Sequence, residues 1–202
     1  MYLTKIQKII WMSNSYLCKA RLRSLGRSCF ISPKADLPDK KNVSIGGRSR
    51  IGECCRIEAL GGSSIEIGEK SWIYRYAHLI TYGGKITLGN KCSVQPWVMI
   101  SGPGNVTIGN YVRIAPRVTI VAGNHVFDRS DIPIHEQGMK GGDITIQDDC
   151  WLGANAVILS GVTVREGSVI GAGSVVTKDT EAYGIYAGVP AKLIGSRRDA
   201  KS

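Results

Sequence analysis

Phenylalanine is nearly absent from this sequence: two Phe stand among 202 residues, and aromatic residues make up only 7% of the chain. The aromatic side chains do not alternate with basic ones, which argues against a nucleic-acid-binding surface. Isoleucine, valine and glycine are abundant instead, with 25 glycines in all. β-Branched residues combined with frequent glycine indicate many short strands joined by tight turns. The length indicates one domain, or one domain with a short appendage.

The six cysteines include no C-x-x-C pair, and two of them are adjacent in the sequence. Neither a zinc site nor a small disulfide scaffold has this spacing, so we expect reduced thiols in a cytoplasmic protein. No apolar run reaches membrane-spanning length, and the N-terminus lacks the apolar core of a signal peptide. The cysteines are Cys18, Cys29, Cys54, Cys55, Cys92 and Cys150.

Acidic residues are outnumbered: 16 Asp and Glu stand against 26 Lys and Arg, which gives a formal net charge of +10. Such an excess favours an anionic partner without identifying it. Much of the excess lies near the two ends of the chain, at Lys5, Lys8, Lys19, Arg21, Arg23 and Arg27, and at Lys192, Arg197, Arg198 and Lys201.

Aliphatic residues recur with a period of six from residue 45 onward. This period fits neither an α-helix nor an alternating strand, but it fits a short strand followed by a corner. Three such units return the chain to its starting point, so equivalent side chains stack from coil to coil and form a shared core. The aliphatic positions are Ile45, Ile51, Ile57, Ile67, Ile73, Leu79, Leu88, Val94, Ile100, Ile108, Ile114, Ile120, Ile146, Leu152, Ile158, Val164, Ile170 and Val176.

Glycine follows many of these aliphatic positions. We expect it there because glycine permits corner backbone angles that other residues resist. The glycines concerned are Gly46, Gly52, Gly68, Gly89, Gly109, Gly153 and Gly171.

One long segment interrupts the period, because the next aliphatic position after Ile120 is Ile146. Residues 121–145 therefore leave the solenoid, and a long polar insertion in a regular repeat is usually functional. His125 lies near its start, and histidine is the side chain best suited to take a hydroxyl proton near neutral pH. Of the other two histidines, His78 is expected at the surface, and His135 is a weaker candidate for lining an acceptor cleft.

Residues 146–194 resemble the C-terminal signature of the hexapeptide-repeat acyltransferase superfamily, in the branch of galactoside, maltose, xenobiotic and surface-polysaccharide O-acetyltransferases. The resemblance spans about residues 43–196. It implies an all-β fold, a left-handed parallel β-helix, with a homotrimer and active sites between subunits. We accordingly expect an N-terminal helical or capping segment over 1–42, the β-helix domain over 43–196 with its protruding catalytic loop at 121–145, and a tail at 197–202.

The N-terminal segment allows two interpretations. Residues 3–25 are expected to form a basic helix or helical pair, which either caps the open end of the solenoid or lies on a membrane surface. Its apolar positions are Leu3, Ile6, Ile9, Ile10, Leu17 and Leu22.

The resemblance implies roles for the residues around the insertion. His125 matches the position of the family's catalytic histidine. Gln95 stands where galactoside-type enzymes carry an asparagine that places the acceptor, and Asn124 is an alternative polar contact. A partner for the second imidazole nitrogen is needed, and Asp128, Asp131 or a backbone carbonyl qualify. We thus expect Gln95, Asn124 and Asp128 to contact the acceptor.

Acetyl-CoA is the donor that the resemblance implies, and no metal is expected. Small corner residues would line its pantetheine arm, and basic residues would contact its phosphates. The candidate residues are Trp151, Gly153, Ala154, Gly171, Ala172, Thr177, Lys178, Lys192 and Arg197. The family often has a further basic residue three positions after Lys192, where this chain has Gly195.

The sequence therefore predicts an acetyl-CoA-dependent O-acetyltransferase that acts on a sugar hydroxyl, in surface-polysaccharide biosynthesis, by direct attack with a histidine base. N-acetylation of an amino sugar and acetylation of a xenobiotic are the enzymatic alternatives. A non-catalytic solenoid scaffold is another. A zinc hydratase on the same solenoid is disfavoured, because it needs three convergent histidines and the three present are far apart in sequence.

Overall fold

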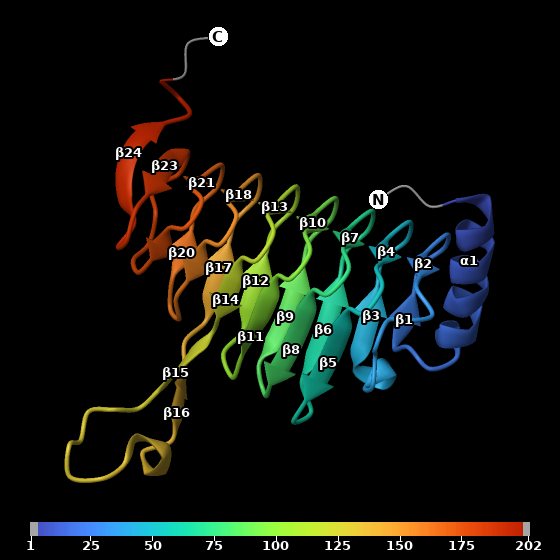
Figure 1. Ribbon diagram of the computed structural model, residues 1–202, viewed down its shortest axis with the longest axis horizontal. Helices are drawn as coiled ribbons and strands as arrows, with labels where there is room; N and C mark the ends of the chain where they lie inside the picture. Colours follow the sequence, from blue (N-terminus) through green and yellow to red (C-terminus); the bar gives the residue numbers. More distant parts are fainter. Residues whose placement is uncertain (1–3, 200–202) are drawn as a thin grey trace.

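The computed structural model describes residues 4–199. Within these residues, coils of short strands stack along one axis, with a single α-helix at the N-terminal end (Figure 1). A complete coil contributes one strand to each of three parallel sheets, which we name A, B and C in chain order. The expected β-helix with a helical N-terminal segment and a protruding loop is confirmed. Residues 1–3 and 200–202, parts of the expected N-terminal segment and tail, lie outside the described residues.

The strands of each sheet follow one another along the axis. Sheet A contains β1 (Ser24–Leu25), β3 (Val43–Ile45), β6 (Ser64–Ile67), β9 (Lys85–Leu88), β12 (Val106–Ile108), β17 (Ile144–Ile146) and β20 (Thr163–Val164). Sheet B contains β2 (Phe30–Ile31), β4 (Arg50–Ile51), β7 (Trp72–Ile73), β10 (Ser93–Val94), β13 (Arg113–Ile114), β18 (Trp151–Leu152), β21 (Val169–Ile170), β23 (Gly184–Ala187) and the antiparallel β24 (Lys192–Ser196). Sheet C contains β5 (Arg56–Leu60), β8 (His78–Tyr82), β11 (Met99–Gly102), β14 (Thr119–Val121), β19 (Val157–Ile158) and β22 (Val175–Val176).

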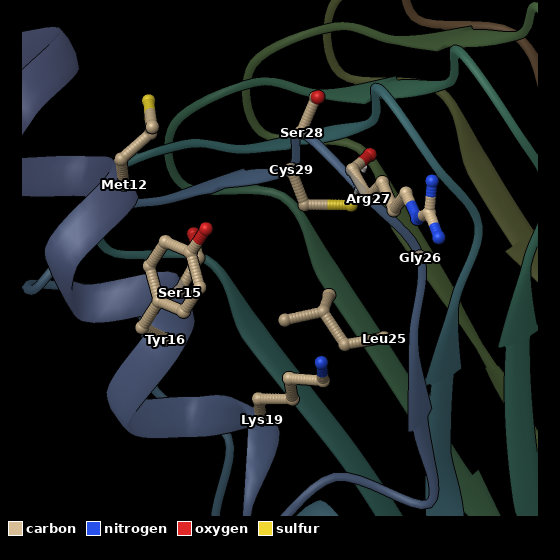
Figure 2. Close-up of a pocket in the computed structure, with 9 residues that line it drawn as sticks. All are labelled: Met12, Ser15, Tyr16, Lys19, Leu25, Gly26, Arg27, Ser28 and Cys29. Atoms are coloured by element: carbon tan, nitrogen blue, oxygen red, sulfur yellow. Dashed lines mark hydrogen bonds between the residues drawn. The ribbon is translucent and has the colours of Figure 1, made fainter.

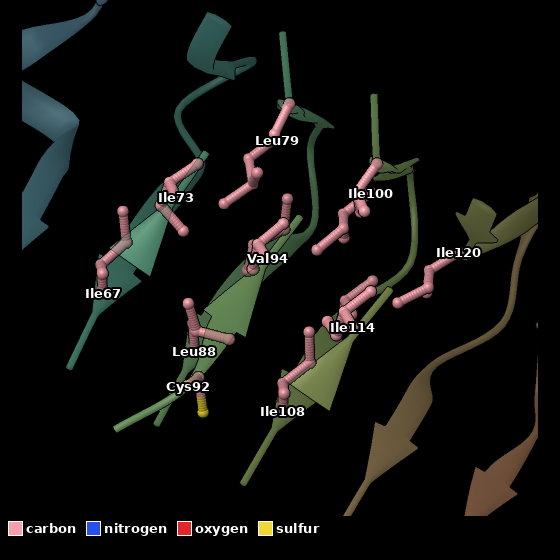
Figure 3. Close-up of a cluster of buried hydrophobic side chains, with 14 of the residues drawn as sticks. Ile67, Ile73, Leu79, Leu88, Cys92, Val94, Ile100, Ile108, Ile114 and Ile120 are labelled. Atoms are coloured by element: carbon pink, nitrogen blue, oxygen red, sulfur yellow. The ribbon is translucent and has the colours of Figure 1, made fainter. Parts of the chain in front are cut away.

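The period-six aliphatic side chains point inward and form the core (Figure 3). In sheet A, Ile67 pairs with Leu88 and Leu88 with Ile108, so the same kind of side chain repeats at each level. Ile73, Val94 and Ile114 repeat in sheet B in the same way. All of these side chains are at most 3% exposed. The core of these coils is thus a stack of aliphatic layers.

The glycines at the corners have a different role from the expected one. Gly46, Gly68 and Gly89 do not adopt positive φ; instead, a Cβ on Gly68 would lie 2.5 Å from the carbonyl carbon of Gly89 in the next coil. The left-handed conformation falls two residues later, at Arg48, Lys70 and other non-glycine residues. Glycine is required because neighbouring coils approach closely, and the expectation about backbone angles was wrong for these three positions.

The parallel pairing begins at Ser24, one coil before residue 43, where the sequence placed the domain boundary. Leu25, Ile31 and Leu37 continue the six-residue period backward and supply the core of this first coil. Its strands β1 and β2 have two residues each, which is too short to stand out in a sequence pattern. A short 3₁₀ helix, Lys40–Asn42, leads into β3.

The helix α1 (Lys5–Lys19) covers the open end of the first coil (Figure 1). A capping box between Thr4 and Gln7 begins it, which satisfies two of its free backbone donors. Asn14 donates from Nδ2 to the carbonyl of Ile31 at 3.1 Å, and Ser15 Oγ accepts the Ile31 N–H at 2.9 Å. These polar contacts fix the helix to the solenoid, and Trp11 on the same helix is buried.

Candidate functional site

A two-stranded antiparallel ribbon projects from the solenoid between β14 and β17 (Figure 1). It consists of β15 (Gly123–His125) and β16 (Met139–Gly141), with His125 opposite Met139. Gly123 lies against Pro103, since a Cβ there would come within 2.5 Å of the proline ring. The insertion expected at 121–145 therefore leaves the coil at the corner between sheets C and A, which we call the C–A corner.

The loop of this ribbon is braced by its own side chains. Gln137 accepts the Arg129 N–H at 3.0 Å and donates from Nε2 to the Arg129 carbonyl at 2.7 Å. A 3₁₀ turn over Ile134–Glu136 precedes it. His135 lies on this turn, with its side chain 80% exposed and 3.8 Å from Glu136. These contacts give the exposed loop a defined path next to His125.

His125 lines a cleft of about 360 Å³ between the ribbon and the solenoid. Its side chain is exposed, and it makes no hydrogen bond to any residue within 4–199. The lining residues are Asn124, His125, Val126, Phe127, Asp128, Lys140, Gly141, Gly142, Ser160 and Gly161. The cleft thus combines one imidazole, one carboxylate, one amine and a hydroxyl.

Three of the residues that line this cleft are among the candidates predicted from the sequence, and others are not. Asn124, His125 and Asp128 come together as expected. Lys140 was missed because it reaches the cleft only through the ribbon register, opposite Asn124. Ser160 was missed because it comes from the next coil, where its hydroxyl donates to the Gly142 carbonyl at 3.2 Å.

The two candidate carboxylates beside His125 differ in their surroundings. Asp131 is paired with Arg129, and hydrogen bonding from that guanidinium lowers the pKa of the Asp131 carboxyl. Asp128 lines the cleft itself. Of the two, Asp128 is the one whose carboxylate remains available to a group in the cleft.

The remaining acceptor and histidine candidates lie elsewhere. Gln95 follows β10 at the corner between sheets B and C, which we call the B–C corner, and its N–H donates to the Ile114 carbonyl at 3.0 Å. It does not line the His125 cleft. His78 is half-buried on β8, not fully at the surface.

Most of the residues expected to bind the donor lie at or beside the same two corners. Gly153 and Ala154 follow β18 at the B–C corner, and Gly171 and Ala172 stack on them one coil later, since a Cβ on Gly153 would meet Ala172 N at 2.6 Å. Trp151, 55% exposed, stands beside them on sheet B. Thr177 and Lys178 instead follow β22 at the C–A corner, one coil beyond Leu159 and Ser160.

The basic C-terminal residues are not equivalent. Lys192 is exposed at the start of β24. Arg197 donates to the Asp149 carboxylate at 2.9 Å and to the Gly167 carbonyl at 2.8 Å, so its guanidinium joins the C-terminal segment to the corner between sheets A and B. Arg198 lies 4.6 Å from the centre of the Tyr183 ring. Lys192 is therefore more accessible to a phosphate than Arg197 is.

The buried thiols are poor nucleophiles. Burial raises the pKa of the Cys55 thiol to about 12 and that of Cys150 to about 11, so both stay protonated near neutral pH. Within residues 4–199, no three His, Cys, Asp or Glu side chains are grouped as metal ligands would be. No helix in this same range is long and apolar enough to cross a membrane.

The fold and the cleft define a β-solenoid that presents a histidine on a ribbon at its C–A corner. Residues 143–178 match the family model described as the hexapeptide repeat of succinyl-transferase. The galactoside O-acetyltransferase of Escherichia coli K12 is 36% identical over 138 residues, which are 66% of this chain and 64% of that protein, just under two thirds of its length. The dTDP-4-amino-4,6-dideoxy-D-glucose acyltransferase of Escherichia coli is 31% identical over 180 residues, 87% of this chain and 82% of that protein. This chain belongs to the hexapeptide-repeat acyltransferases.

A solved structure shows the same fold. A single-site mutant of AntD, an N-acyltransferase from Bacillus cereus in complex with dTDP and coenzyme A, superposes with a TM-score of 0.64 at 23% identity, covering 91% of this chain and 89% of that one. At this level of identity the likeness establishes the fold alone.

Proposed function

We propose that this protein transfers an acetyl group from acetyl-CoA to a sugar hydroxyl, with His125 as the general base. The observation that carries this proposal is the exposed His125 in a cleft between the ribbon and the C–A corner, where Gly141, Gly142 and Gly161 leave room for a ligand. The similarity of this chain to a galactoside O-acetyltransferase supports a sugar as the acceptor.

The reaction follows from what the cleft can do. Neutral His125 accepts the proton of the acceptor hydroxyl while the hydroxyl oxygen attacks the thioester carbonyl. The tetrahedral adduct then collapses, the C–S bond breaks, and the imidazolium returns its proton to the departing thiolate of coenzyme A. Asp128 is our candidate for holding the imidazole in orientation, because Asp131 is already paired with Arg129.

Coenzyme A needs backbone amides for its pantetheine arm and for the developing oxyanion. The N–H groups of Ala154 and Ala172 donate to no atom among residues 4–199, and the methyl side chains leave them accessible. Lys178 and Lys192 are exposed and suit the phosphates of the donor. A fold shared with a protein that was solved with coenzyme A is consistent with this assignment.

A homotrimer would bring the two halves of the site together. The acceptor cleft lies at the C–A corner, whereas the free amides lie at the B–C corner, on the other side of sheet C. If sheet C faces the neighbouring subunit, the C–A corner of one subunit meets the B–C corner of the next, where Gln95 would also lie. Outward-facing residues of sheet C include the apolar Ile80, Met99 and Val157, which suits an interface.

The acceptor that we propose is a unit of a surface polysaccharide or its precursor, acetylated in the cytoplasm, where acetyl-CoA and free thiols are found. N-acylation of an amino sugar is the second candidate. It is favoured by the amino-sugar acyltransferase that matches 87% of this chain. A hydroxyl needs a base more than a neutral amine does, so the exposed His125 favours the O-acetyl alternative.

The test is an acetyl-transfer assay with the full chain, acetyl-CoA and a panel of sugars and amino sugars. His125→Ala is expected to lose about 10²–10⁴ in turnover while keeping its affinity for acetyl-CoA. His135→Ala, the matched control on the exposed turn, is expected to stay within about twofold of the parent, since surface residues away from the chemistry rarely matter.

The product distinguishes the two candidates. An ester is cleaved by hydroxylamine, and an amide is not, so a hydroxylamine-stable product would favour N-acylation. Full activity in His125→Ala would remove the proposed base from the mechanism.

A further inference from the structure

We propose that helix α1 and the recess beside it dock this protein on an anionic lipid surface. This inference is independent of the acetyl-transfer chemistry. It starts from the side of α1 that faces away from the solenoid.

The outer face of α1 is apolar. Trp11, Ser15 and Cys18 point toward the first coil and are buried. The opposite face carries Ile6, Ile9, Ile10, Tyr16 and Leu17, with exposed fractions of 70%, 66%, 48%, 71% and 76%. A helix on a protein surface ordinarily presents polar residues there, so an apolar outer face indicates that something covers it.

The N-terminal segment that carries this face is basic, and of its basic residues Arg23 lies 3.9 Å from Glu66. Seven basic residues and no acidic residue occur before Asp36. Basic residues Lys5, Lys8 and Lys19 lie on α1 itself and are exposed. An apolar helix face flanked by lysines is the arrangement that binds the interface of anionic membranes.

A recess of about 360 Å³ lies between α1 and the first coil (Figure 2). Lys19 from the helix and Arg27 from the coil both line it, together with the hydroxyl-bearing Tyr16 and Ser28. Basic residues beside an apolar helix face attract anionic lipid headgroups. The recess therefore adds two cations next to the apolar face.

A second copy of this chain is a weaker candidate for covering α1. End-to-end pairing would place the lysines of α1 in one copy near those of the other, and like charges at close range disfavour association. Side-by-side packing through sheet C would leave α1 uncovered, because α1 closes the end of the coil stack (Figure 1). Nucleic acid would complement the positive charge but would leave the apolar side chains exposed to water.

The experiment is co-sedimentation of the full chain with vesicles of phosphatidylcholine alone or of phosphatidylcholine mixed with phosphatidylglycerol. We expect binding to the mixed vesicles and at least about tenfold weaker binding to the neutral ones. Ile9→Asp/Leu17→Asp and, separately, Lys8→Gln/Lys19→Gln should each weaken binding about tenfold or more.

Each test variant has a control that makes the same kind of change elsewhere on the surface. Ile194→Asp changes an isoleucine with the same 66% exposure as Ile9 at the far end of the solenoid, and Lys70→Gln/Lys91→Gln removes two exposed lysines from the coils. Both should bind vesicles like the parent. All variants should keep the parent's circular dichroism spectrum, because the changed side chains are exposed.

Three outcomes would overturn the proposal: no binding of the parent to mixed vesicles, parental binding by Ile9→Asp/Leu17→Asp, or loss of binding in the control variants to the same degree. A concentration-dependent doubling of mass that Ile9→Asp/Leu17→Asp abolishes would assign the face to a second copy instead.

Discussion

Asn110 and Asp148 are hydrogen-bonded across neighbouring coils although 38 residues separate them: the Asn110 N–H donates to Asp148 Oδ1 at 2.8 Å, and its side-chain amide donates to Oδ2 at 3.1 Å. The Asn90 N–H donates to Asn110 Oδ1 at 2.9 Å in the preceding coil, where no insertion intervenes. The side-chain ladder thus continues through the insertion without a change of register.

The solenoid should therefore fold without its ribbon. Replacing residues 124–140 by a short glycine-containing turn removes His125 and the loop while leaving β14 and β17 paired on both sides. We expect a thermal unfolding midpoint within a few degrees of the parent, about the shift of one kcal/mol in a chain of this size. Acetyl transfer should be lost while acetyl-CoA binding by calorimetry is kept.

A variant that does not fold would show that the ribbon contributes to the core. A folded variant that still transfers acetyl groups would place the chemistry outside the cleft.

The sequence predicted the solenoid well because its core is linear: one aliphatic residue every six positions determines where each strand points. It placed the start of the solenoid one coil too late, because Leu25 and Ile31 belong to strands of two residues and Leu37 only follows an isolated bridge at Asp36. Long-range pairing, not local pattern, defines such strands.

The site was predicted only in part, for a related reason. His125, Asn124 and Asp128 are neighbours in sequence, so their proximity could be foreseen. Lys140 and Ser160 reach the same cleft through the ribbon register and the coil-to-coil offset. The contact of Arg197 with Asp149 spans 48 residues and depends on the antiparallel return of β24, which has no counterpart in the repeat.

The close approach of the coils gives a stability prediction. Gly68→Ala would place a Cβ 2.5 Å from the backbone of Gly89, whereas a Cβ on Gly195 would meet nothing nearer than 3.9 Å. Overpacking of this kind costs about 1–3 kcal/mol, so Gly68→Ala should lower the unfolding midpoint by about 2–10 °C. Gly195→Ala is the matched control, and an equal loss there would mean that space between coils is not the cause.

Arg197 gives a prediction that separates donor binding from structure. It is held by Asp149 and Gly167, so Arg197→Gln should leave the KM for acetyl-CoA within about twofold of the parent. An exposed ion pair contributes about 0–1 kcal/mol, so only a small loss of stability is expected. Lys192→Gln should instead raise that KM, since a charge-assisted contact contributes about 1.5–3 kcal/mol. The measurement is steady-state kinetics with varied acetyl-CoA. If Arg197→Gln raised the KM and Lys192→Gln did not, Arg197 and not Lys192 would be the phosphate contact.

The thiols give a prediction about pH. Cys54 is exposed and Cys55 is buried beside it, so at neutral pH a water-soluble disulfide reagent should modify Cys54 quickly and Cys55 only on unfolding. Because burial raises the pKa of the Cys55 thiol from 9.0 to about 12, the native state holds a proton that the unfolded state releases first. The contribution of the protonated Cys55 thiol to folding stability is therefore complete below about pH 9, and it is lost as pH rises toward about 12. Thermal unfolding across this range should show a smaller alkaline loss for Cys55→Ala than for the parent, with Cys54→Ala as the control. Equal alkaline losses in all three proteins would assign the effect to other groups.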